Sequence, residues 1–179
     1  MFLRILLIIP VVLLLNLRIF ASTHYAVGAH LKRYNNILND LKKHYKGWNL
    51  NEKVLIRSIV VKKKEEVKKS DVREVYKVLK IKKATLFYDF KKIRKIKLRN
   101  KTVKTYHMNL LTLMKAYLEI FDEMMDSLMK KDLKRYALNL TKLNKLDRKF
   151  KIFAKKYSKL CAKYKVFPPA ISAENFWYK

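Results

Sequence analysis

The sequence is poor in the residues that make tight turns and cross-links. It contains two glycines, three prolines and one cysteine in 179 residues, and neither Gly nor Pro occurs between Trp48 and Phe167. Because Gly and Pro usually make up about 12% of a chain, and β-rich folds need them at hairpins, this scarcity favours long helices. A single cysteine excludes an intramolecular disulfide framework and any multi-cysteine metal site.

Patterns typical of catalysis are also missing. The sequence has no Gly-x-Ser-x-Gly elbow, no P-loop and no dinucleotide-binding glycine pattern. Its four histidines, at positions 24, 30, 44 and 107, belong to no metal-binding helical motif. We therefore expect no catalytic residue, no metal ligand and no cofactor, and we interpret the protein as non-enzymatic. A deep pocket lined by His107 and by acidic side chains would restore the enzymatic hypothesis.

Acidic residues are scarce relative to basic ones. Fourteen Asp and Glu stand against 43 Lys and Arg, which gives a formal net charge of +29. The basic residues are densest in an eleven-residue segment that has no acid, where they are Lys91, Lys92, Arg94, Lys95, Lys97, Arg99 and Lys101. As a helix this segment would lie on an anionic membrane, and as an extended chain or a loop it would follow a phosphate backbone. An ordinary solvated surface in a lysine-rich protein is the alternative.

The N-terminus carries the longest apolar run. Arg4 precedes an eleven-residue apolar run, Ile5 to Leu15, that only Pro10 interrupts, and small residues follow at Ala21–Thr23 and Ala26–Ala29. This order is typical of a secretory signal peptide, so we assign residues 1–28 to a signal peptide and predict export to the periplasm, the cell surface or the medium. The first alternative is an uncleaved single-pass anchor with the basic body in the cytoplasm. The second is a buried core helix.

Residues 105–165 show the clearest helical pattern. Apolar residues alternate at spacings of three and four in two stretches, which lie on either side of a short polar junction at Lys130–Asp132. This is the pattern of a helix packing along one seam, and it predicts a long antiparallel helical hairpin or, with the same seam, a coiled-coil homodimer. The first stretch also carries an acidic stripe expected to face the basic second helix, namely Glu119, Asp122, Glu123 and Asp126.

The region before the hairpin, residues 29–104, is predicted to complete an elongated, mainly α helical bundle. Val54–Ile56 and Ile59–Val61 are β-branched or apolar runs, and Val75–Ile81 shows some alternation. Because β-branched residues are enriched in strands, a short strand pair is the alternative in this region.

The tail, residues 166–179, differs in composition. Pro168 and Pro169 are expected to end the last helix. Phe176, Trp177 and Tyr178 then form an aromatic cluster, interpreted as an anchor at a lipid interface or as a segment that docks on the bundle.

These observations predict an exported or membrane-tethered basic protein that binds an anionic surface or an acidic protein in the cell envelope. Lipid headgroups and wall polymers are the anionic surfaces considered. Because Lys outnumbers Arg, diffuse attraction is favoured over base-specific reading, and a membrane-anchored nucleic-acid-binding protein is the alternative. A chaperone-like role in the envelope and an enzymatic role are the remaining alternatives.

Overall fold

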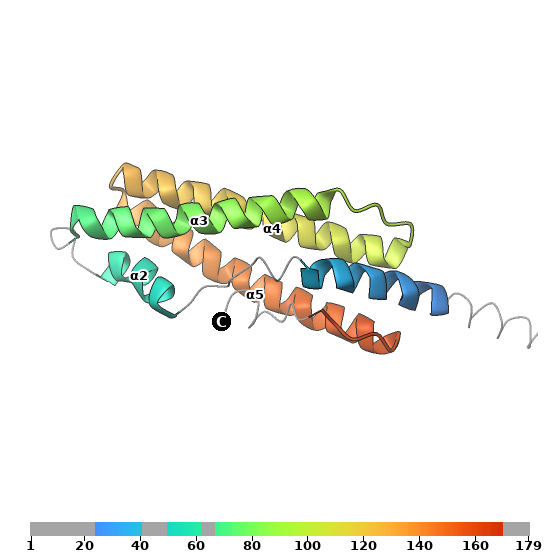
Figure 1. Cartoon of the computed structure of the whole chain (residues 1–179). Coiled ribbons are helices and arrows are strands. Elements are labelled where there is room, and N and C mark those ends of the chain that lie inside the picture. The colour runs from blue at the N-terminus through green and yellow to red at the C-terminus, as the bar shows by residue number, and fades with distance from the viewer. Residues whose placement is uncertain (1–23, 41–49, 62–66, 170–179) are drawn as a thin grey trace, which may run out of the picture.

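The computed structural model describes residues 24–40, 50–61 and 67–169 of the chain. Within these ranges the chain is mainly helical, as predicted, and contains no strand. Residues 24–40 form a helix, which α2 (Leu50–Val61), α3 (Lys69–Arg94), α4 (Lys101–Met129) and α5 (Leu133–Lys163) follow. The helices form an elongated bundle (Figure 1).

Helices α4 and α5 lie side by side and antiparallel. Near their joined ends, Lys142 Nζ donates to Glu123 Oε2 at 2.7 Å, and farther along, Tyr117 Oη donates to Asp147 Oδ1 at 2.6 Å. The apolar seam between the helices is buried, and its fully or nearly fully buried members include Leu110, Met114, Tyr117, Phe121, Met124, Leu128, Leu143, Leu146, Phe150 and Tyr157. Because burying each large apolar side chain contributes about 1.5–3 kcal/mol, this seam holds the two helices together.

Helix α3 packs along α4 through one apolar face. Val75, Leu79, Leu86 and Ile93 of α3 are buried at helical spacing. The alternation noted from Val75 to Ile81 therefore lies inside a helix, and the strand-pair alternative is wrong for this stretch.

The β-branched runs nearer the N-terminus are helical as well, since Val54–Ile56 and Ile59–Val61 lie in α2. Ile56 and Ile59, one turn apart, are buried against the bundle, and Tyr136 Oη of α5 donates to the Ile56 carbonyl at 3.1 Å. Because strand propensity spans only about 1 kcal/mol, burial at helical spacing overrides it. The strand-pair alternative is thus wrong for α2 too.

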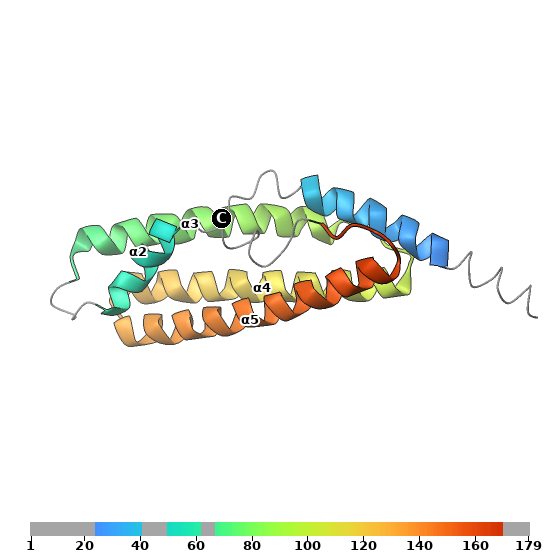
Figure 2. The same ribbon diagram turned by 90° about the horizontal axis from the view of Figure 1, so that it is seen from below.

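The 24–40 helix covers the other end of the bundle, away from α2 (Figure 2). Leu31, Tyr34 and Leu38 are its buried face. His24 Nε2 lies 3.1 Å from the Lys163 carbonyl, which places the first described residue beside the C-terminus of α5.

Candidate functional site

In the structure, the segment predicted to contact an anionic surface contains the end of α3, a connecting loop and the start of α4. Helix α3 ends at Arg94, residues 95–100 connect it to α4, and the Asn100 side chain caps α4 by accepting from the Val103 amide at 3.1 Å. Ile93 is buried, while Ile96 and Leu98 pack partly buried against the core. Of the two conformations considered for Lys91–Lys101, the helical one therefore holds only as far as Arg94, and residues 95–100 form a loop in which the chain reverses direction.

The junction nevertheless presents all of its charge to solvent. The seven basic side chains singled out from the sequence are all exposed, namely Lys91, Lys92, Arg94, Lys95, Lys97, Arg99 and Lys101. Within the described part of the chain, none of them forms an ion pair with a carboxylate. The apolar side chains turn inward and the cations outward, so the junction is a cationic cap on one end of the bundle.

Two exposed aromatic rings hold cations of this cap near the surface of α3. Lys91 Nζ lies 4.4 Å from the ring centroid of Phe87, and Lys92 Nζ lies 4.3 Å from that of Tyr88. Such cation–π contacts contribute about 0.5–1 kcal/mol at exposed sites. The rings also leave an apolar surface beside the ammonium groups, because Phe87 is 44% and Tyr88 is 52% exposed.

Three segments that are distant in the sequence extend the cap over the whole end of the bundle. Residues 24–39, 90–118 and 148–169 contain nineteen Lys and Arg residues and no Asp or Glu. All nineteen side chains are exposed. Figures 1 and 2 place the three segments together, and we name this region the acid-free end.

A buried polar cluster joins two of these segments, residues 24–39 and 148–169. Tyr157 Oη of α5 donates to Asn35 Oδ1 at 2.6 Å, and Asn35 Nδ2 donates to the Phe167 carbonyl at 2.7 Å. The same Nδ2 donates to Cys161 Sγ at 3.6 Å. Asn35 is 3% exposed, so its amide joins the 24–40 helix, α5 and the chain after α5 in a water-poor environment.

Burial changes the acid–base properties of this cluster. It raises the pKa of the Tyr157 phenol, and it raises the pKa of the Cys161 thiol against the opposing effect of hydrogen bonds from Asn35 and Tyr157. A buried, protonated thiol is a poor nucleophile. Cys161 therefore acts here as a packed, hydrogen-bonded side chain.

His107 of α4 is also buried, and it contacts Tyr34, the residue that precedes Asn35 in the chain. Its Nδ1 lies 3.1 Å from Tyr34 Oη, and burial lowers the pKa of the imidazole. The acidic stripe begins at Glu119, twelve residues farther along α4 and so about 18 Å away at ~1.5 Å per residue. The structure therefore does not bring His107 and the acidic stripe together in one pocket.

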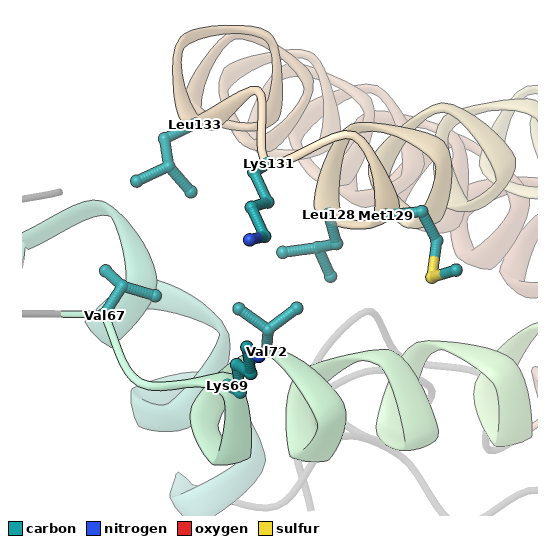
Figure 3. A pocket seen from close by; sticks show the side chains of 7 residues that line it. All are labelled: Val67, Lys69, Val72, Leu128, Met129, Lys131 and Leu133. Atoms are coloured by element: carbon teal, nitrogen blue, oxygen red, sulfur yellow. The ribbon is translucent and has the colours of Figure 1, made fainter. Parts of the chain in front are cut away.

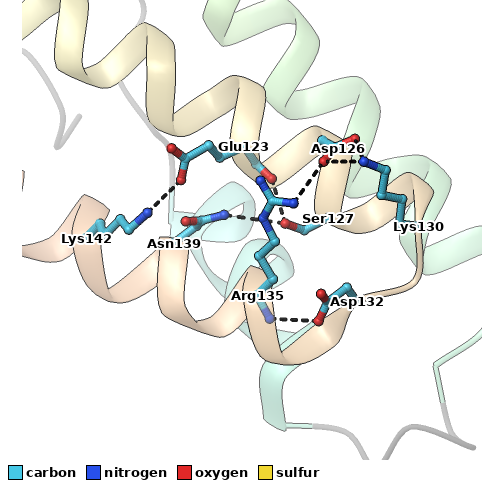
Figure 4. Close-up of polar contacts among 8 residues, drawn as sticks. All are labelled: Glu123, Asp126, Ser127, Lys130, Asp132, Arg135, Asn139 and Lys142. Carbon is cyan, nitrogen blue, oxygen red and sulfur yellow. Dashed lines mark hydrogen bonds and ion pairs between the residues drawn. The ribbon is translucent and has the colours of Figure 1, made fainter.

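The acidic stripe lies toward the opposite end of the bundle, and each of its carboxylates has a cationic partner. Figure 4 shows the contacts of Glu123 and Asp126. Glu123 pairs with Lys142 of α5 at 2.7 Å, and Asp126 pairs with Lys130 at 2.9 Å and with Arg135 of α5 at 3.3 Å.

The other two carboxylates of the stripe do not face α5, since Asp122 contacts Lys83 of α3 and Glu119 contacts Lys115 of α4. Only half of the stripe therefore faces the basic helix as predicted. No group of three or more metal-ligating side chains occurs in the described ranges.

A cavity that the sequence did not reveal lies between the start of α3 and the α4–α5 turn (Figure 3). Its volume is about 290 Å³. It is lined by five apolar residues, Val67, Val72, Leu128, Met129 and Leu133, and by two lysines, Lys69 and Lys131. Sequence periodicity could not locate it, because its two sides are about sixty residues apart in the chain.

Two predicted elements fall outside the described residues. These are the apolar run Ile5–Leu15 and the aromatic cluster Phe176, Trp177 and Tyr178. Where the structure does describe the chain, no helix is both long enough and apolar enough to cross a membrane.

Comparison with known proteins adds no further information about the site. No protein-family model matches the chain, and neither a curated protein nor a solved structure matches it.

Proposed function

We propose that the acid-free end of the bundle binds an anionic membrane surface, and that the protein is a non-enzymatic, membrane-associated protein of the cell envelope. The observation that carries this proposal is that residues 24–39, 90–118 and 148–169 bring together nineteen exposed cations and contain no Asp or Glu. A surface of one sign produces a field that reaches about a Debye length, roughly 8–10 Å, into solution. Each cation near an anionic leaflet contributes about 1 kcal/mol.

The position of residue 24 supports the same orientation. The first described residue lies at the acid-free end, beside the C-terminus of α5 (Figure 2). If the preceding apolar run anchors the chain, the bundle enters the interface with this end first, and the positive-inside rule places it on the cytoplasmic leaflet. If the run is a cleaved signal peptide, the same end binds an anionic outer surface. Intact mass measurement of the protein from its native host distinguishes the two forms.

The chemistry of the cations favours headgroups over nucleic acid. Fifteen of the nineteen are lysines, which act as compact point charges, whereas Arg provides the planar fork that reads guanine and phosphate in a bidentate manner. The exposed Phe87 and Tyr88 rings beside Lys91 and Lys92 add the apolar and aromatic surface that suits a membrane interface.

Lysine footprinting of the full-length chain tests this proposal. The chain is mixed with nanodiscs of phosphatidylcholine, with or without phosphatidylglycerol, and the rate at which an amine-reactive reagent modifies each lysine is measured by mass spectrometry. We expect Lys95, Lys97 and Lys101 to be protected at least about fivefold by the anionic discs, and the protection to disappear at high salt. Lys77 and Lys80, on the opposite half of α3, serve as internal controls and should change little.

A pair of charge-matched variants separates location from net charge. Replacing Lys91, Lys92, Arg94, Lys95 and Lys97 with Gln should abolish protection of Lys101 and Lys104. Replacing Lys68, Arg73, Lys77, Lys80 and Lys134 with Gln removes the same charge from the other end and should leave that protection intact. Equal effects of the two variants, or protection at both ends, would overturn the proposal. Stronger protection by a single-stranded oligonucleotide than by anionic discs would support the nucleic-acid alternative instead.

A further inference from the structure

The cavity at the opposite end of the bundle combines an apolar interior with two cations. Its five apolar lining residues come from residues 67–72, 128–129 and Leu133, so it lies between the start of α3 and the α4–α5 turn. In Figure 3 the side chain of Lys131 extends between the apolar side chains of α3 and α4, with its ammonium group toward the cavity. Lys69, the first residue of α3, lies on the other side.

The ammonium groups of Lys69 and Lys131 have no carboxylate partner among the described residues. The described acidic side chains nearest to these two lysines in the sequence have other contacts. Asp71 Oδ2 accepts from the Lys68 amide at 3.4 Å. Asp132 Oδ1 accepts from the Arg135 amide at 2.9 Å, and Asp126 pairs with Lys130 and Arg135. Among the described residues, the lining of the cavity therefore carries two cations and no acid.

From this arrangement we infer that the cavity binds a medium-chain carboxylic acid, with the acyl chain between α3 and the α4–α5 turn and the carboxylate at Lys69 and Lys131. Apolar lining with a few convergent polar groups is the usual character of a small-molecule site. One water occupies about 30 Å³ of liquid, so the cavity accommodates on the order of ten heavy atoms, which matches one acyl chain of about eight to ten carbons. A lipid with two long chains exceeds that volume. This site is separate from the membrane-binding surface proposed above.

Photo-crosslinking to the full-length chain tests the inference. The probes are a ten-carbon carboxylic acid that carries a diazirine near its methyl end, and the alcohol of the same length. The protein is held in phosphatidylcholine nanodiscs, and crosslinked peptides are mapped by mass spectrometry. We expect the acid to label residues 67–72 and 128–133, unlabelled decanoate to compete, and the alcohol to label these residues at least about fivefold less.

The variant Lys131→Gly keeps the test independent of folding. Lys131 has a φ of 56°, in the left-handed region that glycine adopts without strain. Glycine at this position should raise the thermal midpoint while it reduces acid labelling at least about fivefold. Lys69→Ala should also reduce labelling. Lys134→Ala, an exposed lysine on the first turn of α5, is the matched control and should label as the wild type does.

Three results would overturn this inference. The first is equal labelling of the cavity by the acid and the alcohol, which would show that the lysines do not select a carboxylate. The second is unchanged labelling of Lys131→Gly with a raised thermal midpoint, which would show that the variant is folded and that its missing ammonium group is irrelevant. Labelling confined to other parts of the chain would have the same consequence.

Discussion

Tyr34 Oη lies 3.1 Å from Nδ1 of His107, and this hydrogen bond fastens the 24–40 helix to α4. Burial raises the pKa of the Tyr34 phenol, so the hydroxyl stays protonated and can donate a hydrogen bond to Nδ1 of the imidazole. Burial also lowers the pKa of His107, so the folded protein favours the neutral ring that can accept at Nδ1. The pair therefore makes attachment of this helix sensitive to acid.

Stability should fall as the solution becomes mildly acidic. Because the pKa of His107 is lower in the folded chain than its usual value of about 6.5, the unfolded chain binds more protons as the pH falls below that value. The contribution of the neutral ring is thus fully present above about pH 6.5 and is lost as the pH falls toward the folded pKa. We expect the urea midpoint to decrease between about pH 7.5 and about pH 5.

His107→Asn is the control for this titration, since Asn has a side-chain acceptor but does not titrate. Its midpoint should depend less on pH than that of the wild type over the same interval. An identical pH dependence in both proteins would assign the effect to other groups.

Removing the Asn35 amide should release the 24–40 helix. In Asn35→Ala the buried Tyr157 hydroxyl loses its acceptor and the part-buried Phe167 carbonyl loses its donor, which together cost about 1–3 kcal/mol. Hydrogen exchange should increase in residues 24–40 and 164–169 before it increases in α4. Asn36→Ala, at an exposed neighbouring position, should change neither. Uniform acceleration of exchange in all helices would contradict the idea of a local clamp.

The attachment of α2 should depend on one largely buried ion pair. Lys82 Nζ of α3 lies 2.9 Å from Glu52 Oε2 of α2, and the Lys82 side chain is only 8% exposed. Glu52→Gln removes the carboxylate that pairs with this buried ammonium, and we expect denaturant unfolding to show a loss of about 1–3 kcal/mol. Adding Lys82→Met to that variant should recover most of the loss, because an apolar side chain suits this environment.

An exposed ion pair provides the comparison for Glu52. Asp122 contacts Lys83 with a side chain that is 56% exposed. Asp122→Asn should cost less than about 1 kcal/mol. Equal losses of unfolding free energy in Glu52→Gln and Asp122→Asn would show that burial does not determine how much these ion pairs contribute to stability.

Asn139 should be a position where an apolar residue raises stability. The residue is fully buried at the hairpin interface, where its Nδ2 donates to Ser127 Oγ at 3.4 Å and its Oδ1 has no partner within the described structure (Figure 4). Leu has the same branched skeleton, and Ser127 keeps its own hydrogen bond to the Glu123 carbonyl at 2.6 Å. Asn139→Leu should therefore raise the unfolding free energy by about 1 kcal/mol in a denaturant titration. A decrease would show that the Asn amide supports the packing.

The buried face of a helix and the density of charge could be read from the sequence, because both depend only on residues that are close together in the chain. Apolar residues at spacings of three and four, such as Leu110, Met114 and Tyr117, indicated the buried face of α4. The cations from Lys91 to Lys101 were identified by density alone, and they are exposed. The conformation of that segment was not accessible, because Ile93, Ile96 and Leu98 fit an amphipathic helix and a turn equally well.

The sequence by itself determined that the chain is mainly helical, because the lack of Gly and Pro and the apolar periodicity act within one or two turns. Only the tertiary structure decided which segments meet. Residues 24–39, 90–118 and 148–169 form one acid-free end because α3, α4 and α5 reverse direction at their turns and bury their apolar faces together. The Asn35 and His107 hydrogen bonds and the cavity beside Lys131 arise in the same way, since each joins residues from helices far apart in the chain.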